Sequence, residues 1–247
     1  MQVLGPFPSL TRAEPPCDFR DRDSLTEGYE ALTSNLRPLI GSGLSAAVYT
    51  QTTDVEIEVN GLMTYDREMV KPHMERVIAA HKTLSLPPPK LVTLVPSSRD
   101  TAVEWKYTTE KPDENWSRTD FDDAAWKKGP GGFGTEGTPG ASVRTLWNTP
   151  DIWLRRTFDL ASTNFTAPQL LIHHDEDVEV FINGKQVGSA TGYTTDYVTL
   201  PISAANRSIL KTGTNTIAVH CKQTGGGQYI DVGIIDLVEA GPAVPDK

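Results

Sequence analysis

Three acidic residues stand close together in the first third of the chain, at Asp54, Glu56 and Glu58. Two carboxyl groups can hydrolyse a glycosidic bond when they lie about 5–5.5 Å apart, with retention, or about 6.5–9.5 Å apart, with inversion. Glu56 and Glu58 would share one side of an extended strand, so their spacing is compatible with this chemistry. The reaction also needs one raised pKa and a closed pocket, which the polar surroundings do not provide. A solvated loop is the favoured interpretation.

A second group of polar residues is formed by His173, His174, Asp175 and Asp177. It could be a metal site or a corner that binds sugar hydroxyl groups, because loops at one end of a β-sandwich often hold ligands. We favour a simpler alternative, in which the two aspartates accept N–H groups of a turn. No further His or Cys stands at the spacing of a transition-metal ligand. The sequence therefore predicts no cofactor, and leaves a structural calcium ion open.

Aromatic residues offer candidates for stacking on a sugar ring. Trp116 and Trp147 lie in polar stretches flanked by Gly and Pro, and Trp147 follows the long Gly129–Gly140 loop. Trp147 and Tyr193 are the best stacking candidates, and packing inside the protein is the alternative for both. The tryptophans in strand-like or turn patterns are predicted to lie in the core, namely Trp105, Trp126 and Trp153.

The elements that must position these residues are mostly strands. Val178, Val180 and Ile182 alternate with polar or aromatic residues, and Asn183-Gly184 fits a two-residue hairpin turn with positive φ. Many short strands with irregular spacers predict a β-sandwich of the jelly-roll type. The predicted strands are Leu91–Val95, Val103–Tyr107, Trp153–Asp159, Gln169–His173, Val178–Ile182, Lys185–Ser189, Tyr197–Leu200, Asn215–Cys221 and Tyr229–Leu237.

The first third of the chain shows a different pattern. Ser24 to Glu27 forms a capping-box sequence, which predicts a helix from there to about Ile40. Leu44–Thr50 is nearly all small or apolar, as in a strand buried on both faces, and a second helix is expected beyond Pro72. Helix, buried strand, loop and helix are typical of an α/β barrel (TIM barrel), although one such unit cannot close a barrel.

Three consecutive prolines, Pro87 to Pro89, mark a stiff linker between the two patterns. The predicted domains are a TIM-barrel tail over residues 1–85, a linker over 86–90, a sandwich over 91–240 and a tail over 241–247. The predicted fold class is therefore mixed, with a partial α/β segment followed by an all-β sandwich.

Composition narrows the classes of partner. The 247 residues carry 23 Lys and Arg against 32 Asp and Glu, a formal charge of −9, which argues against a nucleic-acid surface. No apolar run approaches the length of a membrane span, and the residues before Pro16 lack the features of a signal peptide. We therefore expect neither membrane association nor an export signal in this chain. Whether Cys17 and Cys221 form a disulfide is left open.

Two sets of motifs resemble a known family. Leu44–Glu56 and Asn60–Arg67 resemble the last barrel strand and exit of family 2 glycoside hydrolases, the relatives of β-galactosidase and β-glucuronidase. Four later motifs are similar to the galactose-binding-like sandwich that these enzymes carry. These are Asp120–Trp126, Asp151–Phe158, Val180–Gly184 and Asn215–Val219.

The resemblance implies where chemistry would lie in a complete enzyme. The two catalytic glutamates of the family follow the fourth and seventh barrel strands, whereas this sequence corresponds to the region after the seventh. No catalytic residue is therefore carried over. Gln51 and Asp54 would border the sugar site, and Thr50 stands where the family usually has a tryptophan.

These observations predict the C-terminal part of a family 2-like glycoside hydrolase, whose parent hydrolyses O-glycosidic bonds. The sandwich would support the barrel or bind carbohydrate, and a stand-alone carbohydrate-binding module is the alternative. The expected partners are carbohydrate and the remaining part of a barrel, and the compartment, periplasmic or secreted, is left open. Candidate substrate-binding residues are Gln51, Asp54, Trp147, His174, Asp175, Asp177 and Tyr193.

Overall fold

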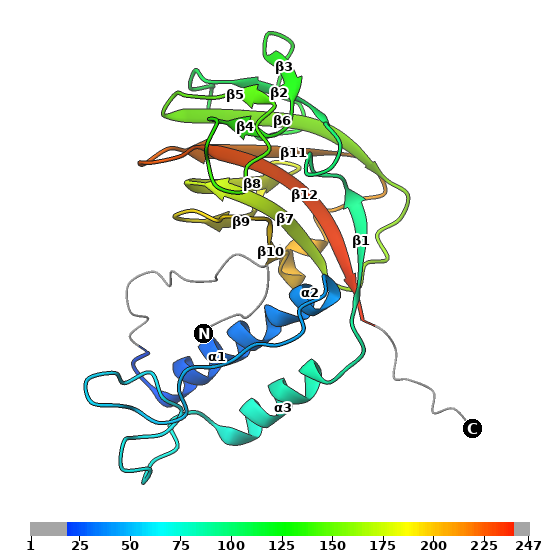
Figure 1. The fold of residues 1–247 in the computed structure, drawn as a ribbon. Helices are drawn as coiled ribbons and strands as arrows, with labels where there is room; N and C mark the ends of the chain where they lie inside the picture. Colours follow the sequence, from blue (N-terminus) through cyan, green and yellow to red (C-terminus); the bar gives the residue numbers. More distant parts are fainter. Residues whose placement is uncertain (1–18, 240–247) are drawn as a thin grey trace. The chain divides into compact units, whose positions relative to one another are not determined.

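The computed structural model describes residues 19–239 (Figure 1). The described chain falls into two compact units, the first reaching Leu91 and including Glu239, and the second running from Val92 to Val238. The predicted 241–247 tail, the N-terminal residues up to Pro16 and Cys17 lie outside the described residues. None of the helices among residues 19–239 is both long and apolar enough to cross a membrane.

The second unit is a β-sandwich, and Figure 1 shows its two sheets as stacked layers. The strand order is β10-β7-β12-β4-β5 in one sheet, with β1 beside β12, and β3-β2-β6-β11-β8-β9 in the other. The first sheet contains β1 (Lys90–Val95), β4 (Phe133–Gly134), β5 (Thr145–Leu146), β7 (Pro168–Asp175), β10 (Val198–Pro201) and β12 (Tyr229–Val238). The second contains β2 (Glu104–Thr108), β3 (Lys127–Pro130), β6 (Asp151–Leu160), β8 (Asp177–Ile182), β9 (Lys185–Ala190) and β11 (Gly213–Lys222).

Alternation along the strands builds the core between the two sheets. On β8, Val178, Val180 and Ile182 are buried and pack with inward-facing residues of both sheets, such as Ile172 on β7. β8 continues through Asn183-Gly184 into β9, with φ of 51° and 82° at the two turn residues. These positive values are what the predicted hairpin turn requires. Apolar periodicity and turn chemistry therefore fix this part of the sandwich locally.

All nine predicted strands are present, with ends that shift by at most two residues. The sequence analysis missed β3, β4 and β5, which are two to four residues long. Gly129 and Gly134 lie in β3 and β4, and such short pieces have no alternation to detect. It also missed the one-turn helix α4 (Ala204–Arg207). The three short strands form through pairing with other strands of the two sheets.

The first unit contains three helices, α1 (Arg22–Ser34), α2 (Leu36–Gly41) and α3 (Met74–Leu84). The predicted helix up to about Ile40 is present but divides at Asn35 into α1 and α2, and its cap is not the one expected. Asp21 is the N-cap, its side chain accepts the Ser24 N–H at 2.7 Å, and Ser24 Oγ accepts the Asp21 N–H at 3.3 Å. A carboxylate at this position satisfies a free N–H group and also lies favourably at the helix N-terminus. Helix α3 begins two residues after Pro72, as predicted.

The predicted buried strand over Leu44–Thr50 is wrong. No strand forms there, and Ala46, Ala47 and Val48 are exposed, although Leu44 is buried. The segment from Thr53 to Val70 is held instead by isolated bridges, such as Thr53 with Met63. A strand of this composition needs neighbours on both sides to form a sheet, and the first unit supplies none among the described residues. The fold is therefore mostly β, and a barrel tail is not seen as such.

Candidate functional site

The candidate residues of the first unit form a polar loop in which Asp54 is the buried member. Asp54 Oδ1 accepts the Gly61 N–H at 2.9 Å and the Lys71 ammonium group at 2.5 Å. Lys71 also donates to the carbonyl oxygen of Val59 at 2.8 Å. Gln51 Nε2 donates to Asn60 Oδ1 at 3.1 Å. Asp54 therefore holds the loop together through a charge-assisted hydrogen bond and is not free to contact a ligand directly.

Glu56 and Glu58 lie in a tight turn in which Val55 and Glu58 exchange two backbone hydrogen bonds. Both side chains are exposed, and Glu56 has a φ of 53°. The prediction of a solvated loop is confirmed. Exposed carboxyl groups of this kind lack the closed pocket in which a glycosidase holds its acid and base.

The two adjacent histidines face opposite sides of strand β7, because successive strand residues alternate. His173 is fully buried, packs against Tyr197 and Tyr229, and has Nε2 3.2 Å from the Thr194 carbonyl oxygen. Burial lowers the pKa of His173 to about 4 and also lowers the pKa of His174. The Nδ1 atom of His174 lies 2.6 Å from the Glu176 carbonyl oxygen. Both histidines are buried, and burial favours their neutral form.

The two aspartates have different environments. Asp177 accepts the Gly192 N–H at 3.1 Å, which confirms the favoured turn role for this residue. Asp175 is only 5% exposed, and burial, followed by the nearby Glu176 carboxylate, raises the pKa of Asp175 to about 6. Among residues 19–239, no group of three or more His, Cys, Asp or Glu side chains is arranged to hold a metal ion. The predicted sugar corner is therefore largely closed to solvent.

Of the aromatic candidates, only Tyr193 lies on the surface. Trp147 is 1% exposed and belongs to the sandwich core, so its predicted role as a stacking platform is wrong. It follows the short strand β5, which places it under the sheet instead of in an open loop. Tyr193 is 54% exposed and pairs through its backbone with Asp175. Trp105 and Trp153 are buried, as predicted, and Trp105 belongs to the core cluster, whereas Trp126 is half-buried.

The sequence analysis missed a polar cluster on the outer face of the second sheet. His220 stands opposite Trp153 on β6 and Glu179 on β8. Its ring stacks on Trp153 with centroids 4.7 Å apart, and its Nε2 lies 2.8 Å from Asp151 Oδ1. The Nδ1 atom faces Glu179 Oε2 at 3.4 Å. Alternation predicts that each residue faces outward, but strand pairing, which brings them together, is not visible in sequence. With both ring nitrogens engaged, His220 ties three strands together.

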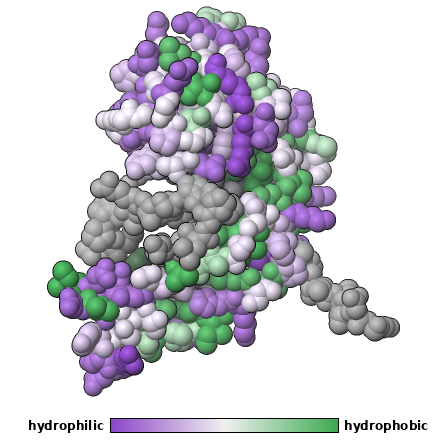
Figure 2. Space-filling model, in the orientation of Figure 1, coloured by the Kyte–Doolittle hydropathy of each residue, from purple (hydrophilic) through white to green (hydrophobic). Residues whose placement is uncertain are grey.

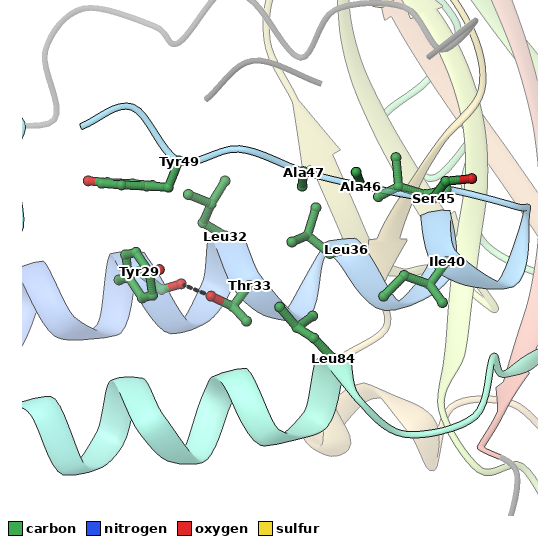
Figure 3. A pocket seen from close by; sticks show the side chains of 11 residues that line it. Tyr29, Leu32, Thr33, Leu36, Ile40, Ser45, Ala46, Ala47, Tyr49 and Leu84 are labelled. Atoms are coloured by element: carbon green, nitrogen blue, oxygen red, sulfur yellow. Dashed lines mark hydrogen bonds between the residues drawn. The ribbon is translucent and has the colours of Figure 1, made fainter. Parts of the chain in front are cut away.

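A pocket of 230 Å³ lies within the first unit (Figure 3). Its walls are apolar except for hydroxyl groups, and Figure 3 shows Thr33 donating to the carbonyl oxygen of Tyr29, a bond of 2.8 Å. It is lined by Tyr29, Leu32, Thr33, Leu36, Ile40, Leu44, Ser45, Ala46, Ala47, Tyr49 and Leu84. Its lining contains no carboxylate, imidazole, amine or thiol, and its titratable groups are the phenols of Tyr29 and Tyr49.

Comparison with known proteins finds no matching family model and no matching curated protein. Similar solved structures include a β-glucuronidase from Bacteroides uniformis, with 20% identity, 57% of this chain and 18% of that chain covered, and a TM-score of 0.41. A β-glucuronidase from Ruminococcus gnavus has 13% identity, with 59% of this chain and 30% of that chain covered and a TM-score of 0.40. A family 2 glycosyl hydrolase from Bacteroides cellulosilyticus has 18% identity and a TM-score of 0.37. The match covers 53% of this chain and 19% of that chain.

The structures found are therefore of the family that the sequence motifs resemble, over somewhat more than half of this chain. The chain spans less than a third of the length of each of them. A likeness of this degree carries no conclusion about activity, substrate or partners.

Proposed function

We propose that this chain is the C-terminal part of a family 2-like glycoside hydrolase. In this proposal residues 1–85 complete a TIM barrel, and the sandwich is a galactose-binding-like jelly roll that supports it. The parent hydrolyses O-glycosidic bonds, and its catalytic carboxylates lie outside this sequence. The proposal rests on the order of the barrel-exit motif, Leu44–Arg67, and the sandwich motifs that follow it.

Exposed apolar side chains on the first unit are the main structural support for the proposal. This unit leaves large apolar side chains in solvent, including Ile57 at 94%, Val59 and Tyr65 at 73% each, and Met69 at 61%. Figure 2 shows hydrophobic residues on the surface of the part of the chain that is blue to cyan in Figure 1. Gathered apolar surface of this kind marks an interaction site. The remainder of a barrel is the partner that the motifs indicate.

The role in sugar binding proposed for this chain is limited to the rim of the complete barrel. Gln51 lies on the loop that Asp54 and Lys71 hold together, so it would border a carbohydrate bound by the complete barrel. Asp54 is then a positioning residue, because its carboxylate is already bonded to Gly61 and Lys71. Carbohydrate would be a ligand of the assembled enzyme.

The test is an assay of the purified chain on aryl β-galactosides and aryl β-glucuronides. We expect no turnover above buffer, because Glu56 and Glu58 are solvated, whereas a glycosidase holds two carboxyl groups on either side of the scissile bond. Glu56→Gln serves as the matched variant and is expected to behave identically. Turnover that Glu56→Gln abolishes would overturn the proposal. Sequencing of the DNA upstream of Met1 gives an independent check, since the proposal requires a reading frame that encodes the preceding barrel strands.

The alternative of a stand-alone carbohydrate-binding module has no observation in its favour. Trp147, His174 and Asp175 are buried, and Tyr193 is the one candidate of the sandwich that exposes an aromatic face. Calorimetric titration with a panel of oligosaccharides tests this alternative. Saturable binding that is lost in Tyr193→Ala would support a carbohydrate-binding module.

A further inference from the structure

Three consecutive carboxylates, Asp175, Glu176 and Asp177, join strands β7 and β8 without a cationic partner. None of the ion pairs formed in the described part of the chain includes any of them. Asp177 is satisfied by the Gly192 N–H. Asp175 and Glu176 remain as two adjacent negative charges, one of them buried, and such a pair is costly unless another group compensates it.

An unpartnered oxygen atom lies at the centre of this corner. Asp175 is 5% exposed, and among the described residues its Oδ1 atom is shielded from solvent and has no hydrogen-bond donor. The same is true of Gln223 Oε1, on the loop between β11 and β12. Buried polar atoms in native proteins almost always have partners, so each exception needs an explanation. Both side chains have an atom close to Gly227, and their orphaned oxygen atoms point to a ligand that accepts electron pairs from oxygen.

The surroundings keep these oxygen atoms together. A Cβ atom on Gly227 would lie 2.8 Å from Asp175 Oδ2 and 2.8 Å from Thr138 Oγ1, so only glycine lets this loop approach the carboxylate. Gln223 Nε2 donates to the Gly227 carbonyl oxygen at 2.7 Å, which leaves its Oε1 free. The Thr224 hydroxyl donates to Glu176 Oε2. The Gln223–Gly227 loop is thus held against both carboxylates.

We propose that this corner binds a hard divalent cation, with Ca²⁺ as the best match. Asp175 Oδ1 and a Glu176 carboxylate oxygen supply the charge, and Gln223 Oε1 adds a neutral oxygen ligand. Calcium accepts carboxylate, amide and water oxygens in flexible arrangements, whereas zinc prefers nitrogen and sulfur. Two carboxylates and one amide are consistent with the lack of any cluster of three His, Cys, Asp or Glu among residues 19–239. The site is a property of the sandwich and does not depend on the proposed enzymatic role.

The experiment uses the full chain, stripped with a chelator and then titrated with CaCl₂ by calorimetry and by thermal unfolding. We expect saturable binding of one ion per chain, with a dissociation constant below about 1 mM. At a hundredfold excess over that constant, the unfolding temperature should rise by roughly 5 °C or more. Titrations with MgCl₂ and with NaCl of matched ionic strength serve as controls for ion selectivity and for ionic strength. Terbium gives a spectroscopic readout, because Tyr193 pairs with Asp175 and can sensitise its luminescence.

Variants separate the site from the rest of the acidic corner. Asp175→Asn and Glu176→Gln should each abolish calcium binding and the thermal shift, while Asp177→Asn and the outward-facing Glu179→Gln should keep both. Near-UV circular dichroism verifies folding, and Glu176→Gln, at a less buried position, serves if Asp175→Asn does not fold. Absence of saturable binding up to about 10 mM Ca²⁺ would overturn the proposal. So would binding that persists in both Asp175→Asn and Glu176→Gln.

Discussion

Asp175 and His173 lie on the same face of strand β7 and respond to burial in opposite directions. The pKa of Asp175 is raised to about 6, so the folded chain favours its neutral form. The pKa of His173 is lowered to about 4, so the folded chain favours its neutral form too. Between about pH 4 and 6, stability falls as pH rises on account of Asp175 and rises with pH on account of His173. The two contributions therefore partly cancel.

Replacing Asp175 by Asn should expose this balance. In the presence of a chelator, folded Asp175 keeps a proton between pH 4 and 6 that the unfolded chain has already released. The free-energy cost of ionising this carboxyl group in the folded chain is therefore fully present above pH 6. We expect Asp175→Asn to be more stable than the wild type at pH 7.5 by about 1–3 kcal/mol and nearly equal near pH 4. Urea unfolding at both pH values measures the difference. His173 is common to both proteins and cancels, and a variant that is less stable at pH 7.5 would contradict the prediction.

At the scale of an element, the β8–β9 hairpin shows how one turn residue links distant strands. Asn183 Nδ2 donates to the Ile209 carbonyl oxygen and to Asn215 Oδ1, both at 2.8 Å. Its Oδ1 accepts the Thr216 N–H at 2.9 Å. Asn215 is itself 1% exposed. The turn therefore serves both the hairpin and the start of β11.

Asn183→Ala should destabilise the sandwich by about 2–4 kcal/mol. It removes three hydrogen bonds in a buried setting and places alanine at a φ of 51°. Asn206→Ala is the matched control, because the Asn206 side chain makes only a 3.4 Å contact with the Gln186 carbonyl oxygen, and it should change stability by less than about 0.5 kcal/mol. Denaturant midpoints with unchanged slopes would measure both effects. Equal losses in the two variants would contradict the role given to Asn183.

At the scale of the whole molecule, the two units differ in how much apolar surface they bury. The sandwich has a continuous core that draws on both sheets. In the described part of the first unit, the buried hydrophobic residues are Tyr29, Leu36, Leu44 and Val77. Among residues 19–91, so small a core provides little hydrophobic free energy to offset conformational entropy.

We therefore expect the segment Val92–Val238, expressed alone, to fold and to unfold in one cooperative transition. The first unit alone should give no sharp transition, because many of its described large apolar residues are exposed and only four are buried. Differential scanning calorimetry of the full chain and of the two segments makes the comparison. A cooperative transition of the isolated first unit, with a heat comparable to that of the sandwich, would show that it is self-contained and would weaken the proposed link to a larger barrel.

The sequence by itself determined the features that are local in the chain. Period-two alternation sets the strands of the sandwich, Asn183-Gly184 sets their tightest turn, and the alternating positions on β8 set its core-facing side. The helices of the first unit were also predicted, with the cap misplaced by three residues because Asp21 competes with Ser24 for the same role. Each of these depends on residues within a few positions of one another.

Only the tertiary structure decided what depends on distant partners. Trp147 is buried because β5 pairs with β4, and His220 meets Trp153 and Glu179 because β11 lies between β6 and β8. Leu44–Thr50 is no strand, since a strand exists only where another chain segment accepts its hydrogen bonds. Asp175 packs against Gly227, on the loop before β12, and this contact joins segments that are far apart in the sequence. Pairing and burial are properties of neighbours in space, which a pattern of residue types along one chain does not record.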